Sequence, residues 1–153
     1  MNKHLRLTTP IIVILALAAC AGTDSGTAPE TEPPSQSSSD LAGTAWELVE
    51  IQSMDDQTWS PTDPSRYTLT FQPDGTASMD LYCNRGRADW STAETSQLTF
   101  SPIASTSALC QDEGLSERYA MQLGFVRSYL LRDGHLFLAT YADGAIIEFR
   151  PAD

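Results

Sequence analysis

The clearest pattern in the chain is the alternation of apolar and polar residues in RYTLTFQPDGTASMDLY, residues 66–82. The apolar positions of its two runs are Tyr67, Leu69, Phe71, Ala77, Met79 and Leu81. A period of two is typical of strands with one buried face, and the Pro73-Asp74-Gly75 sequence between the runs favours a tight turn. The pattern predicts a β-hairpin that buries these six side chains.

The C-terminal part of the chain repeats this pattern. In RSYLLRDGHLFLATYADGAIIEFR, residues 127–150, Asp-Gly pairs at 133–134 and 143–144 separate three apolar runs. This arrangement predicts an antiparallel meander of three strands. TAWELVEI, residues 44–51, and QLTF, residues 97–100, are predicted as two further strands.

One helix is predicted between these strands, in DEGLSERYAMQLGFV, residues 112–126. The apolar residues at helical spacing are Leu115, Tyr119, Leu123 and Val126. Asp112, Glu113 and Glu117 lie near its start, where the helix dipole favours acids, and Gly124 lies near its end. The order of elements predicts an α+β domain: a small twisted antiparallel sheet, curled toward a barrel, with one α-helix packed on a face.

Residues 1–19 have the organisation of a signal peptide. Lys3 and Arg6 form a basic segment, and the apolar run at residues 11–19 is too short to span a bilayer as a stable helix. Small residues lead directly to Cys20, which resembles the lipobox of bacterial lipoproteins, in which the cysteine is acylated and becomes the new N-terminus. The alternative is an ordinary secretory peptide with a chance cysteine.

The residues after Cys20 predict a location and a tether. Ala21 stands where an aspartate would, in many Gram-negative lipoproteins, favour the inner membrane, so the resemblance implies a lipid-anchored protein of the outer membrane facing the periplasm. Residues 20–40 are rich in Ser, Thr, Pro and acids and predict a disordered tether of about 25 Å. Residues 41–153 (153 − 40 = 113 residues) then form one domain with a single core.

The chain is strongly acidic, with 9 Lys and Arg against 20 Asp and Glu and a formal net charge of −11. Removal of residues 1–19 takes away Lys3 and Arg6 and leaves 7 Arg against 20 acids, a balance of −13. This charge excludes nucleic acid as a partner, because phosphate contacts require clustered basic residues. Membrane association is expected through palmitate and other acyl chains on Cys20, and the domain is expected to be monomeric.

Several segments together resemble the META domain of HslJ-like bacterial lipoproteins. They are LAGTAWELVEI at 41–51, CNRG at 83–86, LTFSPIASTSALC at 98–110 and YLLRDGHLFLATYADGAIIEF at 129–149. The most specific parts are Cys83-Asn84 and residues 105–110, whereas Tyr82 stands where many members have glycine. The resemblance implies a small β-rich fold with one helix and an envelope role linked to heat shock, stress response and antibiotic tolerance. It supplies no accepted catalytic site, and no cofactor is expected.

Cys83 and Cys110 remain once Cys20 is assigned to the lipid anchor, and an exported chain enters an oxidising compartment. Zinc needs further Cys or His ligands and a catalytic cysteine needs a base, yet His135 is the single histidine after the signal segment. The pattern favours a disulfide between Cys83 and Cys110. Two free structural thiols are the first alternative, and a metal site or catalysis is the second.

NRGRADW, residues 84–90, is a candidate ligand-binding turn. The candidate binding residues are Asn84, Arg85, Arg87 and Trp90, which offer hydrogen bonds and stacking to a carboxylate or a sugar. The alternative is a plain surface turn, since Asn and Gly suit turns for conformational reasons alone. The tryptophans available to a partner surface are Trp46, Trp59 and Trp90.

The sequence contains no recognisable catalytic arrangement. Residues 101–110 are rich in hydroxyls but lack a Gly-x-Ser-x-Gly elbow, and the carboxylates form neither an evident acid–base pair nor a calcium loop. We therefore expect a non-catalytic envelope lipoprotein, HslJ-like, that binds or stabilises an envelope protein or a small ligand under stress. The alternatives are an inhibitor of an envelope-directed enzyme such as lysozyme, which a negative surface suits, and a small hydrolase.

Overall fold

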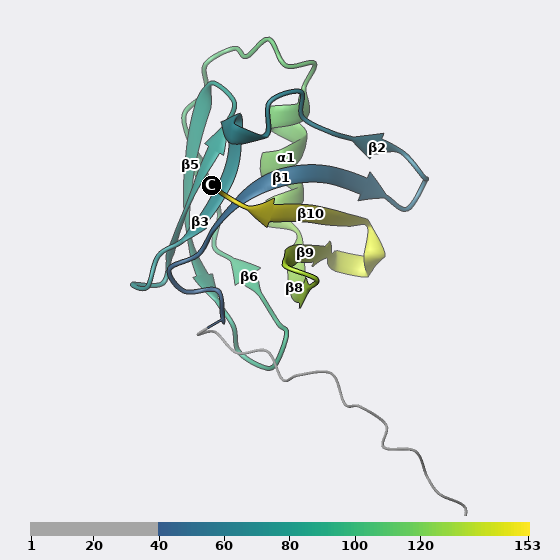
Figure 1. Ribbon diagram of the computed structural model, residues 1–153. Coiled ribbons are helices and arrows are strands. Elements are labelled where there is room, and N and C mark those ends of the chain that lie inside the picture. The colour runs from purple at the N-terminus through teal and green to yellow at the C-terminus, as the bar shows by residue number, and fades with distance from the viewer. Residues whose placement is uncertain (1–39) are drawn as a thin grey trace, which may run out of the picture. The chain divides into compact units, whose positions relative to one another are not determined.

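The computed structural model describes residues 40–153, in which strands form a twisted sheet accompanied by one α-helix (Figure 1). The predicted signal peptide, the acylated Cys20 and all but the last residue of the tether lie outside the described residues. Within the described part of the chain, no helix is long and apolar enough to cross a membrane.

The strands and the helix that the sequence predicts occur in the expected order, with further elements between them. In chain order, the elements are β1 (Ala45–Ser53), β2 (Thr58–Trp59), η2 (Pro64–Arg66), β3 (Tyr67–Phe71), β4 (Thr76–Leu81), β5 (Asn84–Ser91), β6 (Thr99–Phe100), β7 (Ala104–Ser105), α1 (Leu115–Gly124), β8 (Val126–Arg132), β9 (His135–Thr140), η3 (Tyr141–Asp143) and β10 (Ala145–Pro151).

The strands form one antiparallel sheet in the order β6-β5-β4-β3-β1-β10-β9-β8, with β2 beside β1 and β7 beside β5. Figure 1 shows the first strand, β1, beside the last, β10. The two ends of the order also meet: the Leu98 N–H donates to the Arg127 carbonyl at 3.1 Å, and the Tyr129 N–H donates to the Ser96 carbonyl at 2.9 Å. The sheet is therefore a nearly closed barrel, and the predicted fold class is confirmed.

The alternating patterns mark many of the side chains that form the core. The six apolar residues of the β3–β4 hairpin are all buried, with at most 3% of their surface exposed. Leu69 lies opposite Met79, so the two strands pair in the register that places both on the inner face. The hairpin thereby supplies one wall of the core.

The Asp-Gly turns of the meander differ from each other. Asp133 and Gly134 form a two-residue turn between β8 and β9, with φ of 54° and 80°, as a hairpin with two left-handed residues requires. Between β9 and β10 the chain instead makes the short helix η3, and the left-handed residues are Ala142 and Asp143. Gly144 has an ordinary φ of −63°. The second connection is therefore longer than the sequence suggests.

Helix α1 is held in place by the packing of its buried face and by a hydrogen bond at its start. Leu115, Tyr119 and Leu123 are buried, and the Tyr119 hydroxyl donates to the Thr68 carbonyl of β3 at 3.1 Å. At its start, the Asp112 carboxylate accepts the Ser116 N–H at 2.7 Å. Asp112 thus satisfies a free backbone donor of the first turn, in keeping with the predicted acids there.

Candidate binding cleft beside the disulfide

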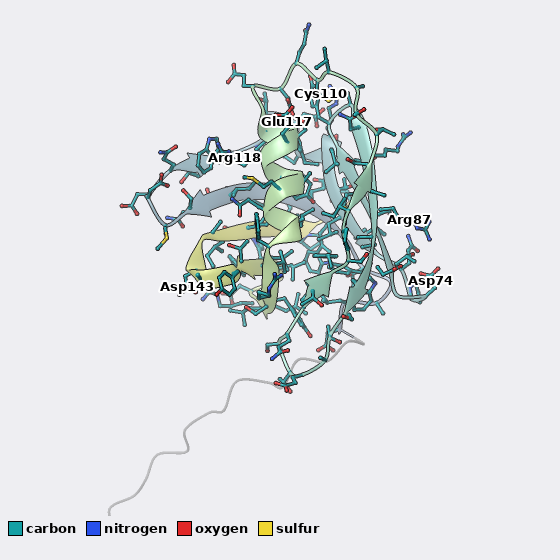
Figure 2. All side chains as sticks on the ribbon, turned by 180° about the vertical axis from the view of Figure 1, so that it is seen from behind. Asp74, Arg87, Cys110, Glu117, Arg118 and Asp143 are labelled. Atoms are coloured by element: carbon teal, nitrogen blue, oxygen red, sulfur yellow. A yellow bond between two sulfur atoms is a disulfide. The ribbon has the colours of Figure 1, made fainter. Side chains whose placement is uncertain are left out.

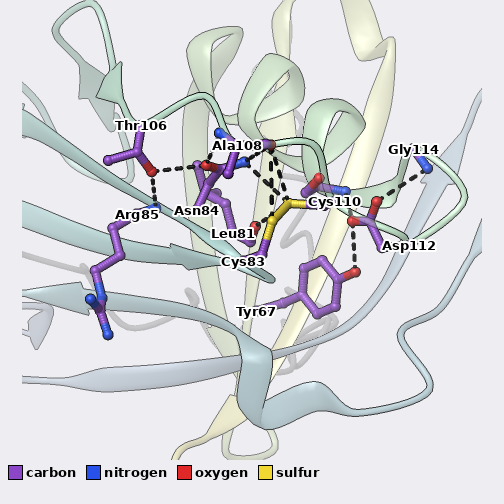
Figure 3. The surroundings of a disulfide bond; sticks show 11 residues. Tyr67, Leu81, Cys83, Asn84, Arg85, Thr106, Ala108, Cys110, Asp112 and Gly114 are labelled. Carbon is purple, nitrogen blue, oxygen red and sulfur yellow. Dashed lines mark hydrogen bonds between the residues drawn. A yellow bond between two sulfur atoms is a disulfide. The ribbon is translucent and has the colours of Figure 1, made fainter.

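A disulfide joins Cys83 to Cys110, whose Cα atoms lie 5.7 Å apart across a sequence separation of 27 residues. It links the β4–β5 turn to the loop that leads into α1 (Figure 3). The disulfide expected from the sequence is confirmed. Neither sulfur is therefore a free nucleophile or a metal ligand.

Asn84 holds the same loop through its side chain (Figure 3). Its Nδ2 donates to the Ala108 carbonyl at 2.8 Å, and its Oδ1 accepts the Ala108 N–H at 2.7 Å. The same Oδ1 accepts the Thr106 hydroxyl at 2.9 Å. The Cys83-Asn84 pair thus fixes the loop against β5 with one covalent bond and several hydrogen bonds, which is a structural role for this motif.

The interpretation of residues 84–90 as a turn is wrong. Asn84–Ser91 form strand β5, and the turn before it is confined to Tyr82 and Cys83. Because side chains alternate along a strand, the candidate residues are divided between its two faces. The exposed side chains of β5 are Arg85, Arg87, Asp89 and Ser91, and the buried residues are Gly86, Ala88 and Trp90. The four candidate residues therefore do not form one binding surface.

The buried residues of β5 are packed tightly. Trp90 is 9% exposed, and its indole N–H lies 3.1 Å from the Thr76 carbonyl, which accepts the hydrogen bond. At Gly86, a Cβ atom would stand 3.2 Å from both Ile103 Cγ2 and Met79 Sδ, which is tighter than most contacts of real Cβ atoms. Close packing against Ile103 and Met79 therefore favours glycine at this position.

The two arginines of β5 point away from the core. Arg85 Nε lies 3.4 Å from Asp80 Oδ1 in an exposed ion pair, which contributes little to stability. Arg87 lies near Asp74, at the opposite side of the domain from Arg118 in the view of Figure 2. Neither arginine lines the cleft described next.

A cleft of about 650 Å³ lies beside the disulfide, since Tyr82 and Gln111, the sequence neighbours of the two cysteines, both line it. We call it the Trp59 cleft. Its aromatic lining residues are Trp59, Tyr67 and Tyr82, and its charged lining residues are Asp63, Arg66, Asp112 and Glu113. They come from β2 and the loop after it, from η2, from the start of β3, from the β4–β5 turn and from the segment before α1.

Two arginines are stacked on the rings of this cleft. The guanidinium carbon of Arg66 lies 3.7 Å from the ring centre of Tyr82, and that of Arg118 lies 3.7 Å from the ring centre of Trp59. Both separations are within the range of cation–π attraction. Arg118 belongs to α1 and does not line the cleft, so it contacts the indole from outside.

Tyr67 and Asp112 are paired in the cleft lining, with the Tyr67 hydroxyl donating to Asp112 Oδ2 at 2.9 Å (Figure 3). Burial, and then this hydrogen bond, raise the pKa of the Tyr67 phenol well above its ordinary value. Partial burial acts to raise the pKa of Asp112, but the hydrogen bonds from Ser116, Tyr67 and Gly114 outweigh it and lower that pKa. The pair is therefore a neutral phenol that donates to a fixed carboxylate.

Tyr82 has a left-handed backbone, with φ of 63°. This conformation favours glycine, the residue expected there from the resemblance described above. In this chain the strain is borne by a tyrosine whose ring lies under Arg66 and 5.8 Å from the ring of Tyr67. The departure from the family pattern therefore adds an aromatic ring to the cleft.

The other candidate residues lie outside the cleft. His135 begins β9, and its Nδ1 lies 2.7 Å from Oε1 of Glu148 on β10. In the hydroxyl-rich segment, Ser101 Oγ accepts the Asp89 N–H at 2.9 Å, so this hydroxyl satisfies a backbone donor. Among residues 40–153, no group of three or more His, Cys, Asp and Glu side chains is placed to hold a metal ion.

Of the three tryptophans expected to serve a partner surface, Trp59 alone lines the cleft. Trp46 and Trp90 belong to the core, with 7% and 9% of their surface exposed. The contributions of Arg66, Tyr67 and Tyr82 to a common site were not predicted. The sequence predicted only that Tyr67 is buried, because its place in the alternating pattern marks it as a core residue.

Comparison with known proteins agrees with the fold. A solved NMR structure of a protein from Burkholderia xenovorans is similar, with a TM-score of 0.62 and 18% identity, over 82% of this chain and 97% of that chain. A crystal structure of a DUF4847 family protein from Bacteroides vulgatus has a TM-score of 0.56 and 15% identity, over 72% of this chain and 93% of that one. At these identities the likeness shows the fold alone. No curated protein matches the sequence. The profile of the META domain family matches residues 39–153, which is well over half of the chain, and the protein therefore belongs to the META domain family.

Proposed function

We propose that this protein is a non-catalytic, HslJ-like lipoprotein of the bacterial envelope that binds a partner or ligand in a stress-related role. The lipobox-like sequence that ends at Cys20 supports a lipid anchor, and residues 20–40 support a tether that holds the domain off the outer membrane on its periplasmic side. The META domain at residues 39–153 is then the binding part of the molecule.

The Trp59 cleft is the observation that carries this proposal. It is a cleft in which three aromatic side chains lie among polar and charged ones, and it therefore offers both stacking and hydrogen bonding to a ligand. The disulfide and the Asn84 hydrogen bonds hold one of its boundaries in place. A preformed site of this kind loses little conformational entropy when a ligand binds.

The chemistry of the cleft favours binding over catalysis. A general acid near neutral pH needs a carboxyl group with a raised pKa, whereas the pKa of Asp112 is lowered. A tyrosine base needs a lowered pKa, whereas that of Tyr67 is raised. A panel of esterase, peptidase and glycosidase substrates tests this part of the proposal, and turnover that Asp112→Asn or His135→Ala abolishes would contradict it.

Cross-linking in the living cell tests the binding role. The full chain should capture envelope partners, and Tyr82→Ala should reduce the captured material because it removes a ring from the cleft. Tyr141→Ala is the matched control, since Tyr141 is 70% exposed and does not line the cleft. Equal losses in both variants, or no loss in either, would show that the cleft is not the binding site.

An inhibitor of an envelope-directed enzyme such as lysozyme is the second candidate. The observation that favours it is the net charge of −11, which attracts a basic enzyme. A complex with lysozyme that inhibits the enzyme and weakens as salt increases would support this role. A small hydrolase is the third candidate, and the substrate panel tests it.

A further inference from the structure

The Trp59 cleft carries more negative than positive side chains. Its lining holds the carboxylates of Asp63, Asp112 and Glu113 against one guanidinium, that of Arg66. The Asp112 carboxylate accepts hydrogen bonds from Tyr67, Gly114 and Ser116, which hold it in place. The chain as a whole has a net charge of −11, so the electrostatic field of the whole molecule has the same negative sign as that of the cleft. The electrostatics of the cleft therefore favour a cation.

The rings of the cleft already contact cations. Arg118 lies over Trp59 but does not line the cleft, which leaves the part of the indole inside the cleft for a ligand. Arg66 lies over Tyr82, is exposed and forms no salt bridge with any residue in the range 40–153. An incoming cation can therefore displace Arg66 from the ring. Aromatic faces bordered by carboxylates are a recognised environment for ammonium and guanidinium groups.

We infer that the Trp59 cleft receives a lysine or arginine side chain from a basic segment of a partner protein. The inference rests on the proposed binding role and adds the chemistry of the partner. A peptide segment fits better than a small amine, because a volume of about 650 Å³ accommodates several groups besides one ammonium. Thr58, Ser60 and Thr62 line the same cleft, and their hydroxyls can bind polar groups of such a segment.

Calorimetric titration of the full-length protein, purified in detergent, tests the sign of the ligand. The probes are a lysine-rich octapeptide, a glutamate-rich octapeptide of equal length, and spermidine. We expect the lysine peptide to bind, to bind more weakly as salt increases, and to bind more tightly than spermidine. Stronger binding of the glutamate peptide overturns the inference, and so does equal binding of spermidine, which would indicate a small-amine site.

Two double variants distinguish the cleft from general attraction to an acidic protein. Asp63→Asn with Glu113→Gln removes two carboxylates from the cleft and should weaken lysine-peptide binding by about threefold to tenfold. Asp89→Asn with Glu117→Gln removes two exposed carboxylates that do not line the cleft and should weaken it by less than about twofold. Equal effects in the two variants overturn the inference.

The variant Arg66→Gln gives the sharpest result. If the ligand is a cation, removal of the Arg66 guanidinium that lies over the Tyr82 ring should tighten lysine-peptide binding by about twofold to fivefold. If Arg66 instead binds an anionic ligand, the glutamate peptide should bind the wild type and lose affinity in this variant, which overturns the inference.

Trp59→Leu should weaken lysine-peptide binding by about fivefold, and Trp59→Phe should restore most of the affinity because it keeps an aromatic ring.

The inference and the proposed function can fail separately. If the lysine peptide does not bind while capture of envelope partners still depends on Tyr82, the inference is wrong and the binding role stands. If the lysine peptide does not bind and capture is independent of Tyr82, both are wrong.

Discussion

The side chain of Asn84 bonds twice to the backbone of Ala108: its Nδ2 donates to the carbonyl at 2.8 Å and its Oδ1 accepts the N–H at 2.7 Å. A neighbouring strand would pair with β5 here through backbone hydrogen bonds, but β7 has already ended at Ser105. The two side-chain hydrogen bonds to Ala108 take the place of that pairing. The disulfide follows two residues later, at Cys110. A side chain and a covalent bond together therefore shape the loop that leads to the Trp59 cleft.

Asn84→Asp should lower the free energy of unfolding by about 1 kcal/mol, because the variant keeps an acceptor but loses the donor to the Ala108 carbonyl. Urea denaturation measures this change. Arg85→Ala is the control in the next residue, since its exposed ion pair with Asp80 should contribute less than about 0.5 kcal/mol. A larger effect of Arg85→Ala would contradict the role given to Asn84.

Loss of the disulfide should appear as lost stability with the secondary structure retained. Cys83→Ser with Cys110→Ser should lower the free energy of unfolding by about 3–4 kcal/mol in the chain-entropy model, because the unfolded chain loses a constraint across 27 residues. Denaturant titration with circular dichroism measures both quantities. Mass spectrometry that finds two alkylatable thiols in the exported wild-type protein would contradict the bond.

The sequence predicts those parts of the fold that rest on local patterns. Alternation located the β3–β4 hairpin, helical spacing located α1, and the small number of cysteines and histidines favoured the disulfide. Strand β5 was missed because Asn84, Gly86 and Asp89 have low strand propensity. Pairing with β4 on one side and with β6 and β7 on the other overrides that propensity.

The Trp59 cleft could not be predicted for a different reason. Trp59 and Arg118 are far apart in the sequence, and they meet because the long side chain of Arg118 on α1 reaches the indole of Trp59 on β2. Tyr82 gave a signal only as a departure from a family pattern. Contacts of this kind depend on how the chain closes its sheet, which no local periodicity encodes.

The lipid anchor remains a prediction from the sequence. Cys20→Ser should block acylation and leave either an uncleaved precursor or a protein released from the membrane, because the thiol is the group that receives the lipid. Metabolic labelling with a palmitate analogue measures the difference. Equal labelling of wild type and variant would contradict the anchor.

Asp112 should make the stability of the helix start depend on pH. Its pKa is lowered in the folded state from an ordinary value of 3.8, so its contribution is complete above pH 3.8 and is lost as the pH falls through the lowered pKa. Asp112→Ala should therefore cost about 1 kcal/mol at neutral pH and progressively less in acid. Denaturation of both proteins between pH 2 and pH 7 measures this difference. Glu113→Gln is the control, and a similar acid-dependent loss in that variant would assign the effect to general charge.

Tyr82 should show opposite effects of its backbone and its ring. At a φ of 63°, residues with a Cβ atom are strained and glycine is not. The free energy of unfolding of Tyr82→Gly should therefore exceed that of Tyr82→Ala by about 1 kcal/mol. Both variants remove the ring that Arg66 stacks on, and both should therefore weaken partner capture to the same extent. Thermal denaturation and the cross-linking assay separate the two effects. If Tyr82→Ala equals or exceeds Tyr82→Gly in stability, the left-handed strain is absent. If Tyr82→Gly alone restores capture, the turn and not the ring determines binding.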